Sequence, residues 1–373
     1  MKRRRSRRSS SSSQEGGASS PKRRMMEKDV PVSLETLFFQ RWLGEGSYGQ
    51  VLQATHSATG REYAIKVIKK RTLVSRGGMK RVILESRILR SASGCPFLIQ
   101  GRFALQTPDL LMMGMDLARG GDLHDLLRNR GPLDISTVKF YAAEIVCALQ
   151  YLHSKGYIHR DLKPANILLD GTGHIKLADF GLAMEGTASR ICVGTRDYMA
   201  PEMRQRLEYD AAVDWYSFGV VLYEMVSGMS RDPDSVYLDY VTRDLLTKLL
   251  WADPRVRLGA NGDIRRHAFF RGINWVALEG LHMVPPIIPE QPPETANLPH
   301  RTLQEMMTAI GEDQMDPTGP EDQQLLQVFS FQGREGQSRL VDPDCWNLKA
   351  LEPWQERRLW HMRTCVVKLA RCD

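Results

Sequence analysis

The sequence feature that most constrains the fold is a polar loop enclosed by apolar runs. Residues 157–169 read Tyr-Ile-His-Arg-Asp-Leu-Lys-Pro-Ala-Asn-Ile-Leu-Leu, and Ala-Asp-Phe-Gly follows, with Asp179 18 residues after Asp161. The apolar flanks indicate strands that hold the loop rigidly on either side. Asp161 is a candidate to orient and deprotonate a hydroxyl, and Lys163 to neutralise a phosphoryl group. Asn166 and Asp179 offer the hard oxygen ligands that Mg²⁺ prefers.

His-Arg-Asp and Asp-Phe-Gly are each loop tripeptides that occur by chance in many proteins. Their order and separation, with Lys163 and Asn166 between them, favour a functional pattern. The two loops resemble the catalytic and metal-binding loops of eukaryotic protein kinases. The resemblance implies an α+β, two-lobed protein kinase fold, with a small lobe that is mainly antiparallel sheet with one key helix and a large lobe that is mainly helical. It also implies ATP and Mg²⁺ as cofactors, and Lys163 with Thr195 points to serine or threonine hydroxyls as acceptors.

A glycine-rich stretch precedes these loops, and residues 44–51 read Gly-Glu-Gly-Ser-Tyr-Gly-Gln-Val. A lone G-x-G-x-x-G also marks dinucleotide-binding folds, in which it opens a helix. Here a turn at 57–60 and a β-prone run at 62–68 follow, which predicts a hairpin that closes its backbone amides over phosphates. The resemblance places these residues at the ATP site: Leu43, Gly44, Gly46, Ser47, Gly49, Val51, Ala64, Lys66, Met115, Asp116, Leu117 and Leu168.

Lys66 lies in the apolar run 62–68, where a lysine is normally on the solvent face of a strand. The resemblance instead assigns it to the α- and β-phosphates of ATP, where it needs an anionic partner. Apolar residues between 80 and 92 follow a helical pattern, and Glu85 on this helix is the candidate partner. The alternative for Glu85 is a solvated helix charge.

Two further segments frame the site. Residues 110–117 read as a strand running into the hinge between the lobes. The resemblance places Met115 at the back of the adenine pocket, with Asp116 and Leu117 offering backbone groups to the purine edge. The alternative for Met115 is core filling, which is the commoner use of methionine. The apolar positions of residues 138–152 are spaced by four and three, which predicts an amphipathic helix that ends near Gly156 and supports the catalytic loop.

Two polar contacts in the large lobe follow from the resemblance. Asp214 opens another apolar helix, which would let its carboxylate hold the backbone of the catalytic loop. Arg257 resembles the arginine that pairs with the glutamate of Ala-Pro-Glu, which is Glu202 in this sequence.

The resemblance covers about residues 37–272, and local strings such as Gly-His-Ile-Lys-Leu-Ala-Asp narrow it to the AGC group. The sequence is most similar to the catalytic domain of novel, delta- or theta-like protein kinase C, without the cysteine and histidine spacing of its regulatory modules. In that group a hydrophobic motif, here residues 326–331, folds back onto the small lobe and steadies the helix that carries Glu85. The predicted division is a disordered basic and serine-rich arm over 1–33, a small lobe over 37–115, a large lobe over 116–272 that is shortened between 229 and 241, a C-terminal tail with the hydrophobic motif over 273–331, and an unassigned tail over 332–373.

Several positions depart from the family pattern. Ile191 stands where the family phosphorylates a threonine, so Arg160 is expected to lack its usual anion unless Thr187 or Ser189 takes that place. Arg196 replaces a proline in the wall that meets the residue following the substrate hydroxyl.

Protein substrates with serine or threonine are the expected partners. Ala165 lacks the acid that related kinases use against basic substrates, which leaves Asp122 as one candidate for recognising a basic context. An upstream kinase is a further candidate partner. We expect a monomer and no dedicated nucleic-acid site.

The net charge of +7 is concentrated at one end. Residues 1–28 carry ten Lys or Arg against two Glu, a net of +8, so the remainder is close to neutral. The arm is compatible with a nuclear-import signal, with adhesion to acidic membrane or nucleic acid, and with a solvated tail that has no partner. No apolar run approaches the roughly 18 residues of a membrane helix, which predicts no transmembrane segment and a cytoplasmic or nuclear location, or both. Six cysteines without a Cys-x-x-Cys pair predict reduced thiols.

All five polar residues that the resemblance assigns to the site are present: Lys66, Glu85, Asp161, Asn166 and Asp179. They favour a serine/threonine kinase that transfers the γ-phosphoryl group of ATP. The alternative is a kinase-fold binding or scaffold protein that binds nucleotide with little or no turnover. The departures at 191, 196 and 229–241 support that alternative, but none of them touches nucleotide. A nucleic-acid binder is a third hypothesis that rests on the arm alone.

Overall fold

The computed structural model describes residues 31–46, 49–76, 78–228, 238–290, 301–303, 305, 329 and 331–332. Contacts divide the chain after Pro31, and the described helices and strands all belong to the unit that begins at Val32. The predicted basic arm therefore lies outside the described residues, except for its last three.

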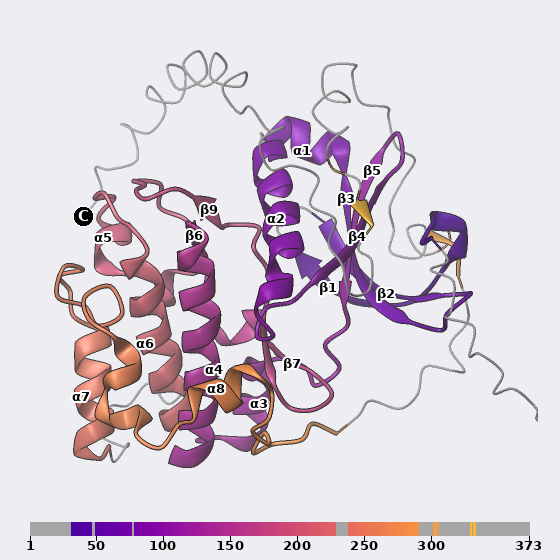
Figure 1. Cartoon of the computed structure of the whole chain (residues 1–373). Helices are drawn as coiled ribbons and strands as arrows, with labels where there is room; N and C mark the ends of the chain where they lie inside the picture. Colours follow the sequence, from indigo (N-terminus) through magenta and orange to yellow (C-terminus); the bar gives the residue numbers. More distant parts are fainter. Residues whose placement is uncertain are drawn as a thin grey trace, which may run out of the picture. The chain divides into compact units, whose positions relative to one another are not determined.

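One antiparallel sheet forms the small lobe (Figure 1). Its strands are β1 (Leu37–Gly46), β2 (Gly49–His56), β3 (Glu62–Lys69), β4 (Gly101–Gln106), β5 (Leu110–Asp116) and β10 (Phe331–Gln332), in the order β1-β2-β3-β5-β4-β10. The hairpin predicted from the glycine-rich stretch is the β1–β2 pair. In β3, Tyr63, Ile65 and Val67 join one apolar cluster, so alternation along the strand directs Lys66 to the opposite face.

Helix α2 (Met79–Ser91) is the helix predicted between 80 and 92, and it follows the short helix α1 (Lys70–Arg76). Its buried face contains Val82, Glu85 and Leu89, which are spaced as one side of a helix requires. Glu85 therefore lies on the buried face and is not a solvated helix charge.

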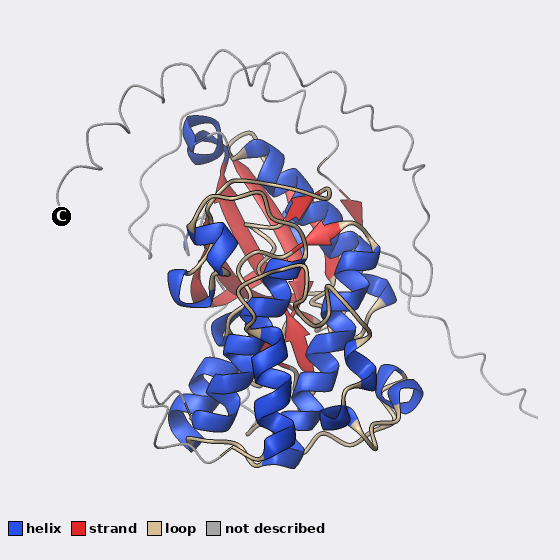
Figure 2. Cartoon of the chain, turned by 90° about the vertical axis from the view of Figure 1, so that its left-hand side faces the viewer, coloured by secondary structure: helices blue, strands red, loops and turns tan. Residues whose placement is uncertain are grey.

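The large lobe is mainly helical, and in the view of Figure 2 most of the strands lie above its helices. The helices are α3 (Leu123–Arg130), α4 (Ile135–Ser154), α5 (Pro201–Arg204), α6 (Ala212–Ser227), α7 (Tyr240–Leu249) and α8 (Trp275–Glu279). The predicted helix over 138–152 is the central part of α4, which begins after Asp134, whose carboxylate accepts the Thr137 N–H at 3.0 Å. It ends just before Gly156, whose φ of 76° suits glycine.

Two short antiparallel strand pairs enclose the polar loops. Strand β6 (Tyr157–Ile158) pairs with β9 (Met184–Glu185), and β7 (Ile167–Leu169) pairs with β8 (Ile175–Leu177). Strands β6 and β7 are the rigid flanks predicted for the loop that contains Asp161.

The C-terminal tail contacts both lobes. Ile287 is buried in the main core, and a Cβ on Gly173 would clash with its carbonyl oxygen. Further on, Arg301 exchanges two backbone hydrogen bonds of 2.9 Å with Phe39 of β1. Phe329 is buried in the main core, and β10 pairs with β4 at the sheet edge. The hydrophobic motif thus reaches the small lobe as predicted, although residues 326–328 and 330 lie outside the described residues.

Two predicted features lie mostly outside the residues that the structure describes. Residues 229–237 of the shortened region and 333–373 of the last tail are not described, so those predictions stay as they were made. Among the helices that are described, none combines the length and the apolar character needed to cross a membrane.

Candidate active site

A buried carboxylate on α6 holds the loop that follows β6. Asp214 accepts the N–H groups of His159 and Arg160, both at 2.8 Å, and lies 2.8 Å from His153 Nε2. Burial alone would raise the pKa of Asp214, but the hydrogen bonds with His153 and with the Arg160 backbone outweigh it and lower the pKa. The charged carboxylate thus supports the loop where Arg160 takes a φ of 68°, a conformation that costs free energy outside glycine.

Asp161, Lys163 and Thr195 form one hydrogen-bonded group. Asp161 Oδ1 accepts the N–H of Thr195 at 2.8 Å and its hydroxyl at 2.7 Å. Lys163 Nζ lies 3.0 Å from Asp161 Oδ2 and 3.0 Å from Thr195 Oγ1. Gly194 packs so closely that a Cβ there would clash with the carbonyl oxygen of Arg160. The Asp161 carboxylate is therefore held at both oxygens, which is the fixed geometry that a general base would need.

Asn166 and Asp179 lie beside this group. Asn166 Nδ2 donates to the carbonyl of Asp161 at 2.8 Å, and the N–H of Ala178 donates to the carbonyl of Asn166 at 2.9 Å. Within the described part of the chain, Asn166 Oδ1 and Asp179 Oδ2 accept no hydrogen bond. Two free oxygens fit a Mg²⁺ ion that keeps water and phosphate as its other ligands. The same described residues contain no cluster of three His, Cys, Asp or Glu side chains suited to a metal.

Lys66 lies between two carboxylates. Its Nζ is 2.6 Å from Glu85 Oε1 and 3.3 Å from Asp179 Oδ1, and the lysine and glutamate side chains are only 4% and 3% exposed. Burial alone would lower the pKa of Lys66, but the charges of Glu85 and Asp179 raise it. The predicted ion pair is present, and Lys66 is not on a solvent face. Asp179 is 35% exposed, so this end of the group is open to a ligand.

The glycine-rich hairpin passes over Lys66. A Cβ on Gly46 would lie 3.2 Å from Lys66 Cε, and one on Gly49 would clash with the Val67 carbonyl. The residues predicted at the ATP site fall on β1 and β2, on β3 and at the end of β5, with Leu117 just after β5 and Leu168 on β7. Ser47 lies outside the described residues.

Asp116 differs in one respect from its predicted role. Its side chain forms two hydrogen bonds of 2.6 Å with Arg102, and its N–H donates to the carbonyl of Gln100 at 3.1 Å. The N–H of Asp116 is therefore not a donor for a purine, and a backbone contact from this residue is limited to its carbonyl. The sequence contained no signal that Arg102 would occupy this carboxylate.

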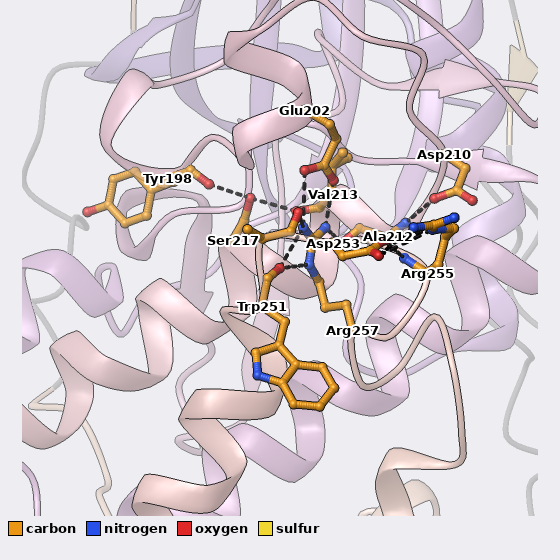
Figure 3. A network of polar contacts seen from close by, with 11 residues as sticks. Tyr198, Glu202, Asp210, Ala212, Val213, Ser217, Trp251, Asp253, Arg255 and Arg257 are labelled. Carbon is orange, nitrogen blue, oxygen red and sulfur yellow. Dashed lines mark hydrogen bonds and ion pairs between the residues drawn. The ribbon is translucent and has the colours of Figure 1, made fainter.

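A buried ion pair anchors the end of the activation segment, which is the stretch from Asp-Phe-Gly to Ala-Pro-Glu, residues 179–202 (Figure 3). Arg257 Nη1 lies 2.6 Å from Glu202 Oε1, and Nη2 lies 3.0 Å from Oε2. Arg257 also donates to the carbonyls of Ala212 at 2.9 Å and Trp251 at 3.0 Å. The predicted pair therefore connects α5, the start of α6 and the loop after α7.

Arg257→Ala should cost about 3–5 kcal/mol of folding free energy, because it leaves the Glu202 carboxylate buried without its cation. Differential scanning calorimetry should show a clear fall in the thermal midpoint. The control is Arg255→Ala, because Arg255 is 86% exposed in its pair with Asp253 whereas Arg257 is fully buried. A surface pair of this kind contributes only about 0–1 kcal/mol. Equal losses in the two variants would contradict the prediction.

The guanidinium of Arg160 does not bind either predicted substitute for a phosphate. It donates to the carbonyls of Leu182 at 2.8 Å and Ala183 at 3.4 Å, and to the hydroxyl of Tyr209 at 3.1 Å. Neither hydroxyl contacts Arg160 in the unphosphorylated chain, and the suggestion that Thr187 or Ser189 takes the place of the missing threonine stays a prediction. Sequence reasoning missed Tyr209, because nothing local marks a tyrosine hydroxyl as a partner for an arginine 49 positions away.

A second buried pair was also missed. Glu144 Oε1 on α4 lies 2.6 Å from His174 Nδ1, and Oε2 accepts the Ile175 N–H at 2.9 Å. This pair fixes the β7–β8 hairpin, which follows Asn166, to the helix. An acid within the apolar pattern of α4 was the available signal.

Comparisons with known proteins agree with this geometry. The family model described as Protein kinase domain matches residues 38–236. Mouse protein kinase C delta type is 40% identical over 323 residues, which cover 80% of this chain and 48% of that protein. The RAC serine/threonine-protein kinase of Drosophila melanogaster is 37% identical over 81% of this chain and 54% of its own length. Human serine/threonine-protein kinase Sgk2 is 38% identical over 67% of this chain and 75% of its own length.

The chain spans about half the length of the protein kinase C delta relatives that it matches. The match to the family model, the coverage of human Sgk2 and the two polar loops held between the lobes lead to one assignment. This chain belongs to the protein kinase family.

Proposed function

We propose that this protein is a serine/threonine protein kinase that transfers the γ-phosphoryl group of ATP to hydroxyls of protein substrates. The observation that carries the proposal is that the polar residues of the site contact one another. Lys66 contacts both Glu85 and Asp179, and Asp161, on the loop after β6, is bound to Thr195. Family members named as serine/threonine kinases support the choice of acceptor.

Each residue then has a role that its contacts suit. Lys66, fixed by Glu85, would bind the α- and β-phosphates, and the free oxygens of Asn166 and Asp179 would hold Mg²⁺. When bound, the magnesium–ATP complex supplies the phosphoryl group and shields its negative charge.

The acceptor end of the site is formed by the catalytic loop. Asp161 would orient the acceptor hydroxyl and take its proton, while Lys163 would neutralise charge on the transferring group. Thr195 holds Asp161 through two hydrogen bonds, and its position between the base and Lys163 favours serine or threonine acceptors.

A transfer assay tests this function. Full-length protein would be incubated with radiolabelled ATP, magnesium and a basic serine peptide, and the matched peptide with alanine in place of serine is the control. Label on the serine peptide alone is the expected result. Nucleotide binding without any transfer would instead support the scaffold alternative. The kinase is favoured because the departures at Ile191 and Arg196 leave the contacts of Lys66, Asp161 and Asp179 intact.

Asp122 is our proposed contact for a basic substrate, since Ala165 is exposed and carries no charge. Asp122 caps α3 by accepting the Asp125 N–H at 2.8 Å. Asp122→Asn keeps a capping oxygen but removes the charge, and we expect it to raise the KM for a basic peptide by about two- to fivefold.

The control for this variant is Asp125→Asn on the same helix, because Asp125 already pairs with Arg128 at 3.0 Å. For wild type and for both variants, the KM should be measured with the basic peptide and with a peptide that has no basic residues. An equal rise in both variants, or no rise in Asp122→Asn, would remove Asp122 from substrate recognition.

The remaining properties are proposals from the sequence. The charge pattern supports a cytoplasmic or nuclear location, and the departures from the family leave an upstream kinase as a candidate regulator. We also propose a monomer without a dedicated nucleic-acid site.

A further inference from the structure

The buried guanidinium of Arg160 is satisfied by neutral groups. Arg160 is 7% exposed, and its partners are the carbonyls of Leu182 and Ala183 and the hydroxyl of Tyr209. In the part of the chain that the structure describes, no carboxylate lies within ion-pair distance of it. A buried cation is costly unless its N–H groups are hydrogen-bonded, and here three neutral oxygens meet that need.

The activation segment supplies no phosphate at the expected position. Ile191 has no hydroxyl, and its exposed fraction is 58%. The hydroxyl of Ser189 accepts the N–H of Ile191 at 3.2 Å and makes no contact with Arg160 among the described residues. An anion is therefore neither present in the sequence at this point nor required by the hydrogen bonds of Arg160.

Tyr209 connects the parts that an anion would otherwise hold together. Its hydroxyl donates to the carbonyl of Ile191 at 2.6 Å and accepts from Arg160 Nη1 at 3.1 Å. Its backbone exchanges two hydrogen bonds with Ser189, of 2.8 and 2.9 Å. The ring is 3% exposed and packs in a cluster with Ile158 of β6. One residue thus binds the segment at two points and the catalytic loop at a third.

We propose that Tyr209 is a positioning residue that holds the activation segment in place of a phosphate, so that phosphoryl transfer by this chain does not depend on phosphorylation of residues 179–202. This inference rests on the proposed kinase function. It deepens that function by stating how the site is kept in its productive arrangement.

The contacts give a path from Tyr209 to the reacting groups. Arg160 precedes Asp161, and Gly194 packs against the Arg160 carbonyl. Thr195, the next residue, binds Asp161 through its N–H and its hydroxyl. A segment that loosens at Tyr209 would loosen the Thr195 contact with the base. The Lys66–Glu85 pair lies in the small lobe and should be unaffected, so ATP binding should not change.

The first test concerns the phosphorylation state of the full chain. Protein treated with a phosphatase, and shown by mass spectrometry to carry no phosphate between residues 179 and 202, should transfer phosphate to the serine peptide as fast as untreated protein. Activity that disappears on this treatment and returns on phosphorylation of the segment would overturn the proposal.

The second test is Tyr209→Phe. Loss of a buried hydrogen bond to a charged group should lower kcat about tenfold or more, with the KM for ATP unchanged. The control is Tyr141→Phe, because Tyr141 is equally buried and its hydroxyl has no partner within the described residues. An unchanged kcat in Tyr209→Phe would refute the proposed role.

A second substitution that restores kcat distinguishes a positioning role of Tyr209 from a role in packing alone. Adding Ile191→Glu to the Tyr209→Phe protein supplies a carboxylate at the position where the family carries its phosphate, and if it pairs with Arg160 it should restore part of the lost kcat. A purely structural role for the tyrosine would give no rescue, and that result would assign the loss to packing and overturn the inference.

Hydrogen exchange keeps the inference distinct from the proposed function. The amides of Ser189 and Tyr209 donate to each other's carbonyls, so they should be protected in unphosphorylated wild-type protein and exchange faster in Tyr209→Phe. If no form of the protein transfers phosphate, the proposed function fails. Equal protection of these amides in wild type and in Tyr209→Phe would refute the proposed role of the Tyr209 hydroxyl, whether or not the protein transfers phosphate.

Discussion

Asp161→Asn is expected to lower phosphoryl transfer to a serine peptide by between about a hundredfold and ten-thousandfold, the range that a positioned general base contributes. Asparagine has the same shape and keeps an oxygen that can accept the Thr195 N–H and hydroxyl, which now bind at 2.8 and 2.7 Å. It cannot take a proton from the acceptor, and it no longer carries the charge that faces Lys163.

The measurement is the single-turnover rate, with nucleotide affinity measured in parallel. Affinity should stay unchanged, because the Lys66–Glu85 pair, which we propose binds the phosphates, lies in the other lobe. Asp253→Asn is the matched control, since that carboxylate is exposed and its one side-chain partner among the described residues is Arg255. Wild-type turnover in Asp161→Asn would remove Asp161 from the chemistry and with it the proposed mechanism.

Lys66→Met is expected to reduce transfer by at least about a hundredfold, because it removes a preorganised cation from a buried site. Methionine is similar in length and apolar, so it can fill the same buried space between α2 and β3. Lys69→Met, at the end of the same strand, should retain activity. Wild-type turnover in Lys66→Met would show that another residue grips the phosphates.

The stability of Lys66→Met should depend on pH in a defined direction. Burial raises the pKa of Glu85 above its ordinary value of 4.5, and the charge of Lys66 opposes that rise. Without the lysine the pKa should rise further, so Glu85 in the folded variant should stay protonated to a higher pH than in wild type. Its stability relative to wild type is then greatest below the unfolded pKa and is lost as pH rises through the folded pKa.

Thermal midpoints of both proteins at acidic and at mildly alkaline pH measure this effect. The gap between variant and wild type should widen as pH rises, while the fold is retained at acidic pH. A gap that is constant with pH would mean that Glu85 is not the group left without its partner.

Much of the fold and of the site followed from local sequence patterns. The G-x-G-x-x-G hairpin, the helix over 138–152 and the strand that carries Lys66 were predicted because each depends on nearby residues and on a repeat of two or 3.6. The pairing of Arg257 with Glu202 and the support of the loop by Asp214 followed from the kinase resemblance, and both contacts are present.

Other features depend on residues that meet only in the folded chain. The engagement of the Asp116 N–H by Gln100 and the Glu144–His174 pair required the packing of separate elements. No local pattern encodes such contacts, because their distances are set by how strands and helices pack.

By itself the sequence determined which polar residues the site contains and that Ile191 cannot carry a phosphate, since both are matters of residue type and spacing. Only the tertiary structure decided what Arg160 binds instead. The cluster around Tyr209 brings its hydroxyl to the guanidinium across 49 residues of sequence. A buried cation takes whichever acceptors the surrounding packing provides.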